Sequence, residues 1–270
     1  MEDEGLKDRT EVRKFDFLSG LYLNLIREIT ISRFKLSEQG SLMGFAWTLA
    51  YPLLSTALFY VLFAGNIGSG ISHFGAYAFS GIITWNLFSN ATNRGLGSIV
   101  FMRDILRNAN IPYEVPPISE VLVRFIAFIL EIFALMGIMA ATGTGFGVEI
   151  IALPALLVLE FLLILGISML LAVLNVFISD INHIWSLVLT MVFFTTPVFY
   201  NVEKIIPKDK MWLYALNPLA NIMVAIRDVT IFHRWPDMPA MAYTLVFCTV
   251  FLVASFKLLK ATESMMSEEL

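Results

Sequence analysis

The chain has 270 residues, of which 58% are hydrophobic and only 15% charged, whereas a soluble domain carries about 25% charged residues. Several apolar runs approach or reach the roughly 20 residues that span a bilayer, so an ordinary soluble protein is excluded. The single cysteine, Cys248, lies in an apolar run, which excludes a disulfide framework and a cysteine metal site. These features predict an all-α integral membrane protein.

The first 14 residues, MEDEGLKDRTEVRK, are charged and lack the apolar core and cleavage site of a signal peptide, so we expect the N-terminus to be retained. Phe15–Ser37 then has the apolar and polar periodicity of an amphipathic helix. Such a helix either packs as in a soluble protein or lies in the membrane interface. The basic residues Arg27, Arg33 and Lys35 beside the first apolar run favour the interface.

Six apolar segments are expected to cross the membrane. The fourth is long enough to tilt, and the fifth is short. The predicted spans are Leu42–Phe63, Phe74–Asn93, Ile118–Ala141, Ile150–Ile178, Ile184–Val198 and Met241–Leu259.

The placement of Lys and Arg predicts the orientation of these spans. Basic residues are frequent before the first span, between the second and third spans and at the C-terminus, whereas loops 64–73 and 142–149 contain none. Loop 201–240 contains five, but long loops follow the positive-inside rule only weakly. We therefore expect a multi-pass protein of the cytoplasmic (inner) membrane with both termini in the cytoplasm.

Between the second and third spans, Ser98–Asn110 (SIVFMRDILRNAN) predicts a short amphipathic helix on the cytoplasmic side. Pro112 and the pair Pro116-Pro117 are expected to end it. This helix is either a passive connector or a surface on which a soluble partner pushes, and the segment alone leaves both possibilities open.

Ionisable residues inside spans are costly and usually face a partner or water. Glu131 in the third span and Glu160 in the fourth could line a polar pathway or form a structural bond between helices, and both possibilities stay open. Glu120 and Arg124 lie near the cytoplasmic boundary, where we expect them to extend toward the interface.

The sequence contains no catalytic constellation. His73, His183 and His233 lie on separate segments without the spacing of a metal site, and Asp180 is expected to cap the helix that follows it. The phosphate loop G-x-x-x-x-G-K-[ST] is absent, so this chain cannot hydrolyse a nucleotide by that mechanism. We expect no enzyme activity, no metal or cofactor in this chain and no nucleic-acid partner.

Aromatic side chains gather in the middles and outer halves of the first, second and fifth predicted spans. Such rings either pack in the protein and against lipid, or carry a sugar chain by stacking, which lets the sugar slide because the contact lacks directional hydrogen bonds. The group comprises Phe59, Tyr60, Phe63, Trp85, Phe88, Phe193, Phe194, Phe199 and Tyr200.

Five segments give the chain a recognisable pattern: RFKLSEQGSLMGFAWTLAYP, YAFSGIITWNLFSNATNRG, LGISMLLAVLNVFISDINHIW, FFTTPVFY and LNPLANIMVAIRD. In this order they resemble the membrane subunit of ABC-2 type exporters for polysaccharides, the group that handles lipid-linked O-antigen, capsule and wall teichoic acid. The resemblance covers roughly Phe15 to Leu259. It implies a homodimer of six-span subunits with two separate ABC ATPase subunits, which bind ATP and Mg²⁺.

The resemblance also implies roles for particular segments. Phe15–Ser37, with its three basic residues, would be the interface helix that grips the ATPase, and Asn201–Leu219 would form short re-entrant helices at the outer face. The first and fifth spans would line a channel, for which all the grouped aromatics except Phe63 are candidates. The family usually has Arg-Asp after the fourth span, where this chain has Ser179-Asp180. The coupling helix would be Ser98–Asn110, with Arg103, Asp104, Ile105, Leu106 and Arg107 as its central residues.

The expected organisation is an N-terminal cytoplasmic segment (1–38), a transmembrane domain (39–260) and a cytoplasmic tail (261–270). The predicted function is ATP-driven export of a lipid-linked glycan through this permease. The alternatives are an ABC-2 permease for a drug or small lipid, an integral-membrane enzyme that acts on lipid-linked sugars, and an ion-coupled transporter. The enzyme would need a cluster of catalytic groups and the ion-coupled transporter inverted repeats, and the sequence shows neither.

Overall fold

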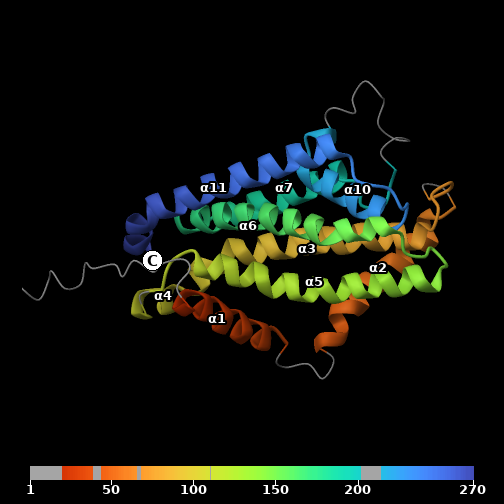
Figure 1. The fold of residues 1–270 in the computed structure, drawn as a ribbon. Helices are drawn as coiled ribbons and strands as arrows, with labels where there is room; N and C mark the ends of the chain where they lie inside the picture. The colour runs from red at the N-terminus through yellow and green to blue at the C-terminus, as the bar shows by residue number, and fades with distance from the viewer. Residues whose placement is uncertain (1–19, 39–43, 66–67, 110, 202–213) are drawn as a thin grey trace, which may run out of the picture.

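Backbone polar groups in a bilayer must be satisfied within the protein, which favours helices for apolar runs of this kind. The computed structural model describes residues 20–38, 44–65, 68–109, 111–201 and 214–270, and every regular element within them is helical. The long helices run side by side along one axis (Figure 1). The described helices, long and short, are α1 (Gly20–Glu38), α2 (Gly44–Phe63), α3 (Phe74–Phe101), α4 (Arg103–Ala109), α5 (Val115–Ala141), the 3₁₀ helix η2 (Val148–Ala152), α6 (Leu153–Phe177), α7 (Ile181–Thr195), α10 (Pro218–Thr230) and α11 (Met238–Glu269).

The all-helical class is confirmed, and four of the described helical stretches are long and apolar enough to cross a membrane. α3 has 28 residues and is therefore about 42 Å long, but it is not one of these four. α7 is apolar but has only 15 residues. The six-span topology as a whole therefore remains a prediction. The four stretches are Ala46–Phe63, Val115–Ala141, Val148–Phe177 and Met238–Glu269.

The centre of the bundle is formed by α3, α5 and α6, with α11 packed along α6 and α1 against α5. Two glycines permit close helix approach. A Cβ at Gly95 of α3 would lie 2.4 Å from the Cβ of Ser168 on α6, and a Cβ at Gly166 would lie 3.2 Å from the Cα of Leu252 on α11. A side chain at Gly95 would push α3 and α6 apart, whereas one at Gly166 would need its neighbours on α11 to shift by a few tenths of an ångström.

The predicted boundary between the second span and the coupling helix is wrong. Ser98–Asn110 was expected to be one helix, but Ser98 to Phe101 form the last turn of α3, and α4 begins only at Arg103. The chain bends at Met102, whose N–H donates to the carbonyls of Ser98 and Ile99. α3 continues past its glycines because its packing against α6 compensates for their low helix propensity.

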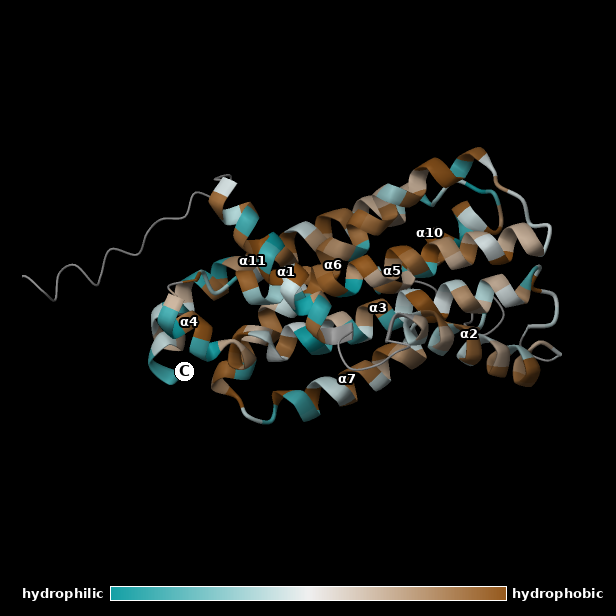
Figure 2. Cartoon of the chain, turned by 90° about the horizontal axis from the view of Figure 1, so that it is seen from below, coloured by the Kyte–Doolittle hydropathy of each residue, from teal (hydrophilic) through white to brown (hydrophobic). Residues whose placement is uncertain are grey.

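Other helix ends also differ from those expected. α11 continues past the predicted span end at Leu259 to Glu269, and Lys260 on its polar part is held by Glu114, the residue just before α5. Part of the predicted interface helix (15–19) and most of the predicted re-entrant segment (202–213) lie outside the described residues. Figure 2 shows hydrophilic residues gathered where α4 and the C-terminus meet, with hydrophobic residues along α5 and α6.

Candidate functional site

The two ends of the bundle differ in chemistry. We name the end that carries Arg33, Arg94, Arg103, Arg107 and Lys260 the basic end; it lies beside α4 and the C-terminus (Figure 1). We name the other end, where α2 and α7 finish, the aromatic end; rings from both helices and from the segment after α7 meet there.

At the basic end, a buried carboxylate joins three helices. Glu120 near the start of α5 is 1% exposed. It accepts hydrogen bonds from Arg33 of α1 and from the Nε of Arg94 of α3, the latter at 2.7 Å. Charge-assisted bonds of this kind are stronger than neutral ones. Glu120 therefore fixes the interface helix to the central bundle instead of extending toward the membrane surface as the sequence suggested.

The predicted interface residues separate into two kinds. Arg33 points inward to Glu120, and its guanidinium lies 4.4 Å from the centre of the Phe101 ring at the end of α3. Arg27 and Lys35 are exposed. Of the three predicted interface residues, Arg27 and Lys35 are therefore accessible to a soluble partner, whereas Arg33 connects α1 to α3 and α5.

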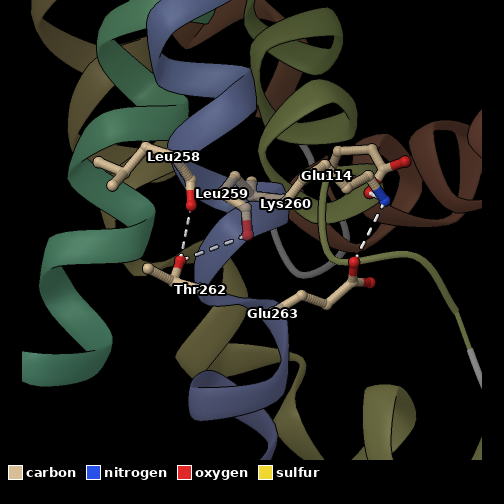
Figure 3. Close-up of polar contacts among 6 residues, drawn as sticks. All are labelled: Glu114, Leu258, Leu259, Lys260, Thr262 and Glu263. Carbon is tan, nitrogen blue, oxygen red and sulfur yellow. Dashed lines mark hydrogen bonds and ion pairs between the residues drawn. The ribbon is translucent and has the colours of Figure 1, made fainter.

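A second buried carboxylate reinforces the same end. Glu114, which precedes α5, accepts a 2.8 Å bond from the Nζ of Lys260 on α11, and Lys260 also lies 3.4 Å from Glu263 (Figure 3). Burial, and then the nearby carboxylate of Glu114, raise the pKa of the Tyr22 hydroxyl on α1. Tyr22 therefore stays protonated, and α1, α5 and α11 meet around Glu114.

α4 presents its charged residues outward. Leu106 is buried and anchors the helix, whereas Arg103, Asp104, Ile105 and Arg107 are exposed. Phe101, which the sequence analysis did not single out, is 71% exposed one turn before Ile105 and stacks on Arg33. Its place within the predicted helix Ser98–Asn110 was the only sequence signal for it. The surface of α4 is thus accessible. Phe101, at the end of α3 just before α4, contacts Arg33.

At the aromatic end and inward from it, rings form one connected series. Phe59 and Phe63 of α2 stack on Phe199 with centroid distances of 5.0 and 5.3 Å. Phe193 contacts Phe199 at 6.1 Å and Trp85 at 5.1 Å. Trp85 contacts Phe88, which in turn contacts Trp185. Phe194 contacts Phe193, and Tyr200 contacts Phe199.

The series contains seven of the eight predicted channel residues. The eighth, Tyr60, lies outside the series, and its ring centre is 6.2 Å from that of Phe74. Phe88 is only 3% exposed and so lies within the packed core of a single chain, whereas Phe194 is 69% exposed. Trp185 was not a candidate, because it lies at the start of the fifth predicted span, eight residues before Phe193. The structure brings the rings together, and their role in a channel stays a prediction.

One arginine holds the chain that carries Phe199. Arg227 of α10 is 1% exposed and donates to the carbonyls of Pro197 and Val198, each at 2.6 Å. It also donates to the Tyr77 carbonyl at 3.2 Å, and its guanidinium lies 3.7 Å from the Tyr77 ring centre. Guanidinium suits this site because it has five donors in a fixed plane. Sequence reasoning did not assign this role, although Arg227 belongs to the quoted LNPLANIMVAIRD segment.

Two further details fix this junction. A Cβ at Gly81 of α3 would lie 2.0 Å from the carbonyl oxygen of Val198, so only glycine fits there. Asn217 caps α10 by accepting from the N–H groups of Leu219 and Ala220, and it donates to Thr196 at 3.1 Å. The segment after α7 is therefore locked between α3 and α10.

The remaining sequence candidates are placed as follows. Glu160 on α6 is fully buried and has no hydrogen-bond partner among the described residues, and Glu131 on α5 is 3% exposed. Asp180 occupies the position before α7, but its side chain makes no cap bond, so the predicted side-chain cap is wrong. The Asp180 backbone carbonyl instead accepts from the N–H of His183. Ser179, where a charge pair was in question, is exposed.

The similarity of this chain to known proteins extends over both ends of the bundle. Residues 21–231, from α1 to the end of α10, match the model of the family described as ABC-2 type transporter. The chain is 29% identical over 246 residues to the O-antigen export system permease protein RfbA of Myxococcus xanthus, which covers 90% of this chain and 93% of that protein. Two proteins of the same name from Klebsiella pneumoniae are 24% and 25% identical, each over 80% of this chain and 83% of their own length.

Proposed function

Because this chain belongs to the ABC-2 type transporter family, as a membrane permease without a catalytic domain, we propose that it exports a lipid-linked polysaccharide of the O-antigen, capsule or teichoic acid type. The observation that carries the proposal is similarity to O-antigen export permeases along 80–90% of the chain. The connected aromatic series agrees with it, because stacked rings can hold a sugar chain without fixing its position.

ATP hydrolysis belongs to a partner in this proposal. Two ABC ATPase subunits would bind ATP and Mg²⁺ and associate with a homodimer of this chain in the cytoplasmic (inner) membrane. The basic end would face the cytoplasm with both termini, as its concentration of Arg and Lys favours. The ATPase would contact α4 through Arg103, Asp104, Ile105 and Arg107, and α1 through Arg27 and Lys35.

The packing supports a route by which movement of the ATPase would be passed from α4 to the rest of the bundle. Movement of α4 would reach the end of α3 at Phe101, and from there Arg33 and Glu120 join α3, α1 and α5. Since packed interfaces switch between discrete arrangements more readily than they deform, this joined unit would move as a body. Such a movement would shift α2 and α7 relative to each other and open a path past the rings of the aromatic end.

The proposal is tested in cells by the double substitution Arg103→Glu and Arg107→Glu on α4. Both side chains are exposed, so the variant is expected to fold and insert normally. We expect export to fall at least tenfold and lipid-linked polymer to accumulate inside the cell. Arg234→Glu, an exposed arginine after α10, is the matched control and should leave export unchanged. Normal export by the double variant would contradict the proposed coupling surface.

A further inference from the structure

A cavity of about 470 Å³ lies between α2, α3 and α5. It begins one helical turn from the ion pair of Arg94 and Glu120, because Asn90 on its wall lies four residues before Arg94 on α3 and Arg124 lies four residues after Glu120 on α5. Glu131 is eleven residues from Glu120, so the far end of the cavity lies about 16 Å beyond Glu120 along α5. That depth corresponds to the half of a roughly 30 Å hydrocarbon layer nearest the basic end.

The α5 wall carries opposite charges. Arg124 and Glu131 are seven residues apart, which places both on the same face of α5, with the arginine nearer the basic end. Charged groups at membrane depth are rare and usually face a polar ligand, water or each other. A guanidinium also matches the geometry of a phosphate group. The basic-end half of the cavity therefore suits an anion, whereas the deeper half offers a carboxylate that accepts hydrogen bonds.

The α3 wall carries uncharged polar groups. Asn86, Ser89 and Asn90 follow the i, i+3, i+4 spacing of one helical face, and all three line the cavity. Amides and hydroxyls both donate and accept, as sugar hydroxyls do. None of the three would be favoured against hydrocarbon, so their common direction indicates a polar occupant.

The α2 wall and the end of the α3 wall are aromatic. Trp47 and Tyr51 are one turn apart on α2, and Trp85 on α3 also lines the cavity. Trp47 and Tyr51 are 57% and 63% exposed in the single chain, so their rings are available to a ligand. Trp85 is at the same time a member of the aromatic series through its contact with Phe193. The cavity is therefore continuous with the rings proposed to carry the glycan.

We propose that this cavity binds the head of the lipid-linked substrate before transport. A phosphate next to the lipid lies against Arg124, and the first sugar lies between the rings of Trp47 and Tyr51 and the polar groups of Asn86 and Asn90. This assignment rests on the proposed function and adds to it a loading site with a defined ligand class, a phosphate-linked sugar. Binding is non-covalent, and the sugar leaves toward Trp85.

The cavity can be probed directly with the variant Ser89→Cys in the complete transporter, reconstituted with its ATPase in phospholipid nanodiscs. The native Cys248 is buried and gives little background with a water-soluble maleimide. A polyprenyl diphosphate that carries a disaccharide is expected to slow labelling of the new cysteine at least fivefold. The same lipid without sugar, or the free sugar phosphate, should need at least tenfold higher concentration for equal protection. Absence of protection, or equal protection by the sugar-free lipid or by the free sugar phosphate, would overturn the assignment.

Substitutions on α5 and α3 test the two polar walls of the cavity one at a time. Arg124→Gln and Asn86→Ala are each expected to weaken binding of the disaccharide lipid at least tenfold, measured by microscale thermophoresis, whereas Arg234→Gln should bind as the wild type does. Melting temperatures identify any variant that fails to fold, and the labelling experiment on Ser89→Cys then decides. Unchanged binding by both cavity variants would overturn the assignment.

The assignment and the proposed function fail in different ways. If the wild type binds and exports the disaccharide lipid while the cavity variants still bind it normally, the cavity assignment is wrong and the exported substrate class stands. If the wild type with its ATPase neither binds nor moves any sugar-bearing lipid, the proposed function is wrong as well.

Discussion

The aromatic end and the basic end are held together in different ways. At the aromatic end, one buried cation, Arg227, bonds to the backbone carbonyls of Pro197, Val198 and Tyr77. At the basic end, the carboxylates of Glu114 and Glu120 pair with side chains that are 19–34% exposed. Bonds to backbone carbonyls hold one geometry, whereas ion pairs between partly exposed side chains can exchange partners. The segment after α7 is thus held in one position on α3 and α10, whereas at the basic end side-chain ion pairs join α1, α3 and α5 into one unit.

The largest effect is expected from Arg227→Lys, which keeps the charge but removes the planar set of donors. Buried carbonyls would lose their partners, at a cost of about 3–4 kcal/mol. For a chain of this size the apparent melting temperature should fall by about 10 °C, as followed by circular dichroism in detergent. Arg234→Lys, at an exposed position, is the control and should melt as the wild type does. Equal melting of both variants would contradict the rigid junction.

An intermediate effect is expected from Glu120→Gln at the basic end. Removal of a fully buried partner costs about 3–5 kcal/mol, but Arg33 and Arg94 reach solvent, so we expect about 2 kcal/mol here. The larger consequence should be functional, since α1 is no longer fixed to α5. The purified transporter should hydrolyse ATP at near-normal rates while export falls severalfold. Loss of hydrolysis and export in equal proportion would instead indicate simple misfolding.

The smallest effect on stability is expected from Arg27→Gln on the exposed face of α1. Nη1 of Arg27 and Oε1 of Glu28 are 3.9 Å apart, and both side chains are 70% exposed. The free energy of unfolding should therefore change by less than about 0.5 kcal/mol. Copurification of the ATPase should nevertheless weaken, most clearly at low salt, because the charge lies on the proposed contact surface. Full copurification at every salt concentration would limit the contact to α4.

The sequence predicted the helical class and most helix positions, because continuous apolar runs leave few other structures in a bilayer. It did not predict where α3 ends, since the Gly95 contact with Ser168 that lets α3 continue joins residues 73 positions apart. The inward direction of Arg33 depends in the same way on Glu120, 87 residues later. The role of Arg227 was hidden because its acceptors are backbone carbonyls, which leave no signature in side-chain composition. Local patterns thus located the candidate residues, and long-range packing decided which of them face inward.

The central claim is that this permease moves a lipid-linked glycan when a partner ATPase hydrolyses ATP. The most direct measurement uses proteoliposomes that contain this chain with its ATPase and a fluorescent disaccharide linked to polyprenyl diphosphate. A lectin that cannot cross the membrane detects sugar that has reached the opposite leaflet. We expect lectin-accessible sugar to rise with ATP and Mg²⁺ and to stay at background when a non-hydrolysable ATP analogue replaces ATP. Equal accessibility with and without ATP hydrolysis would contradict the account.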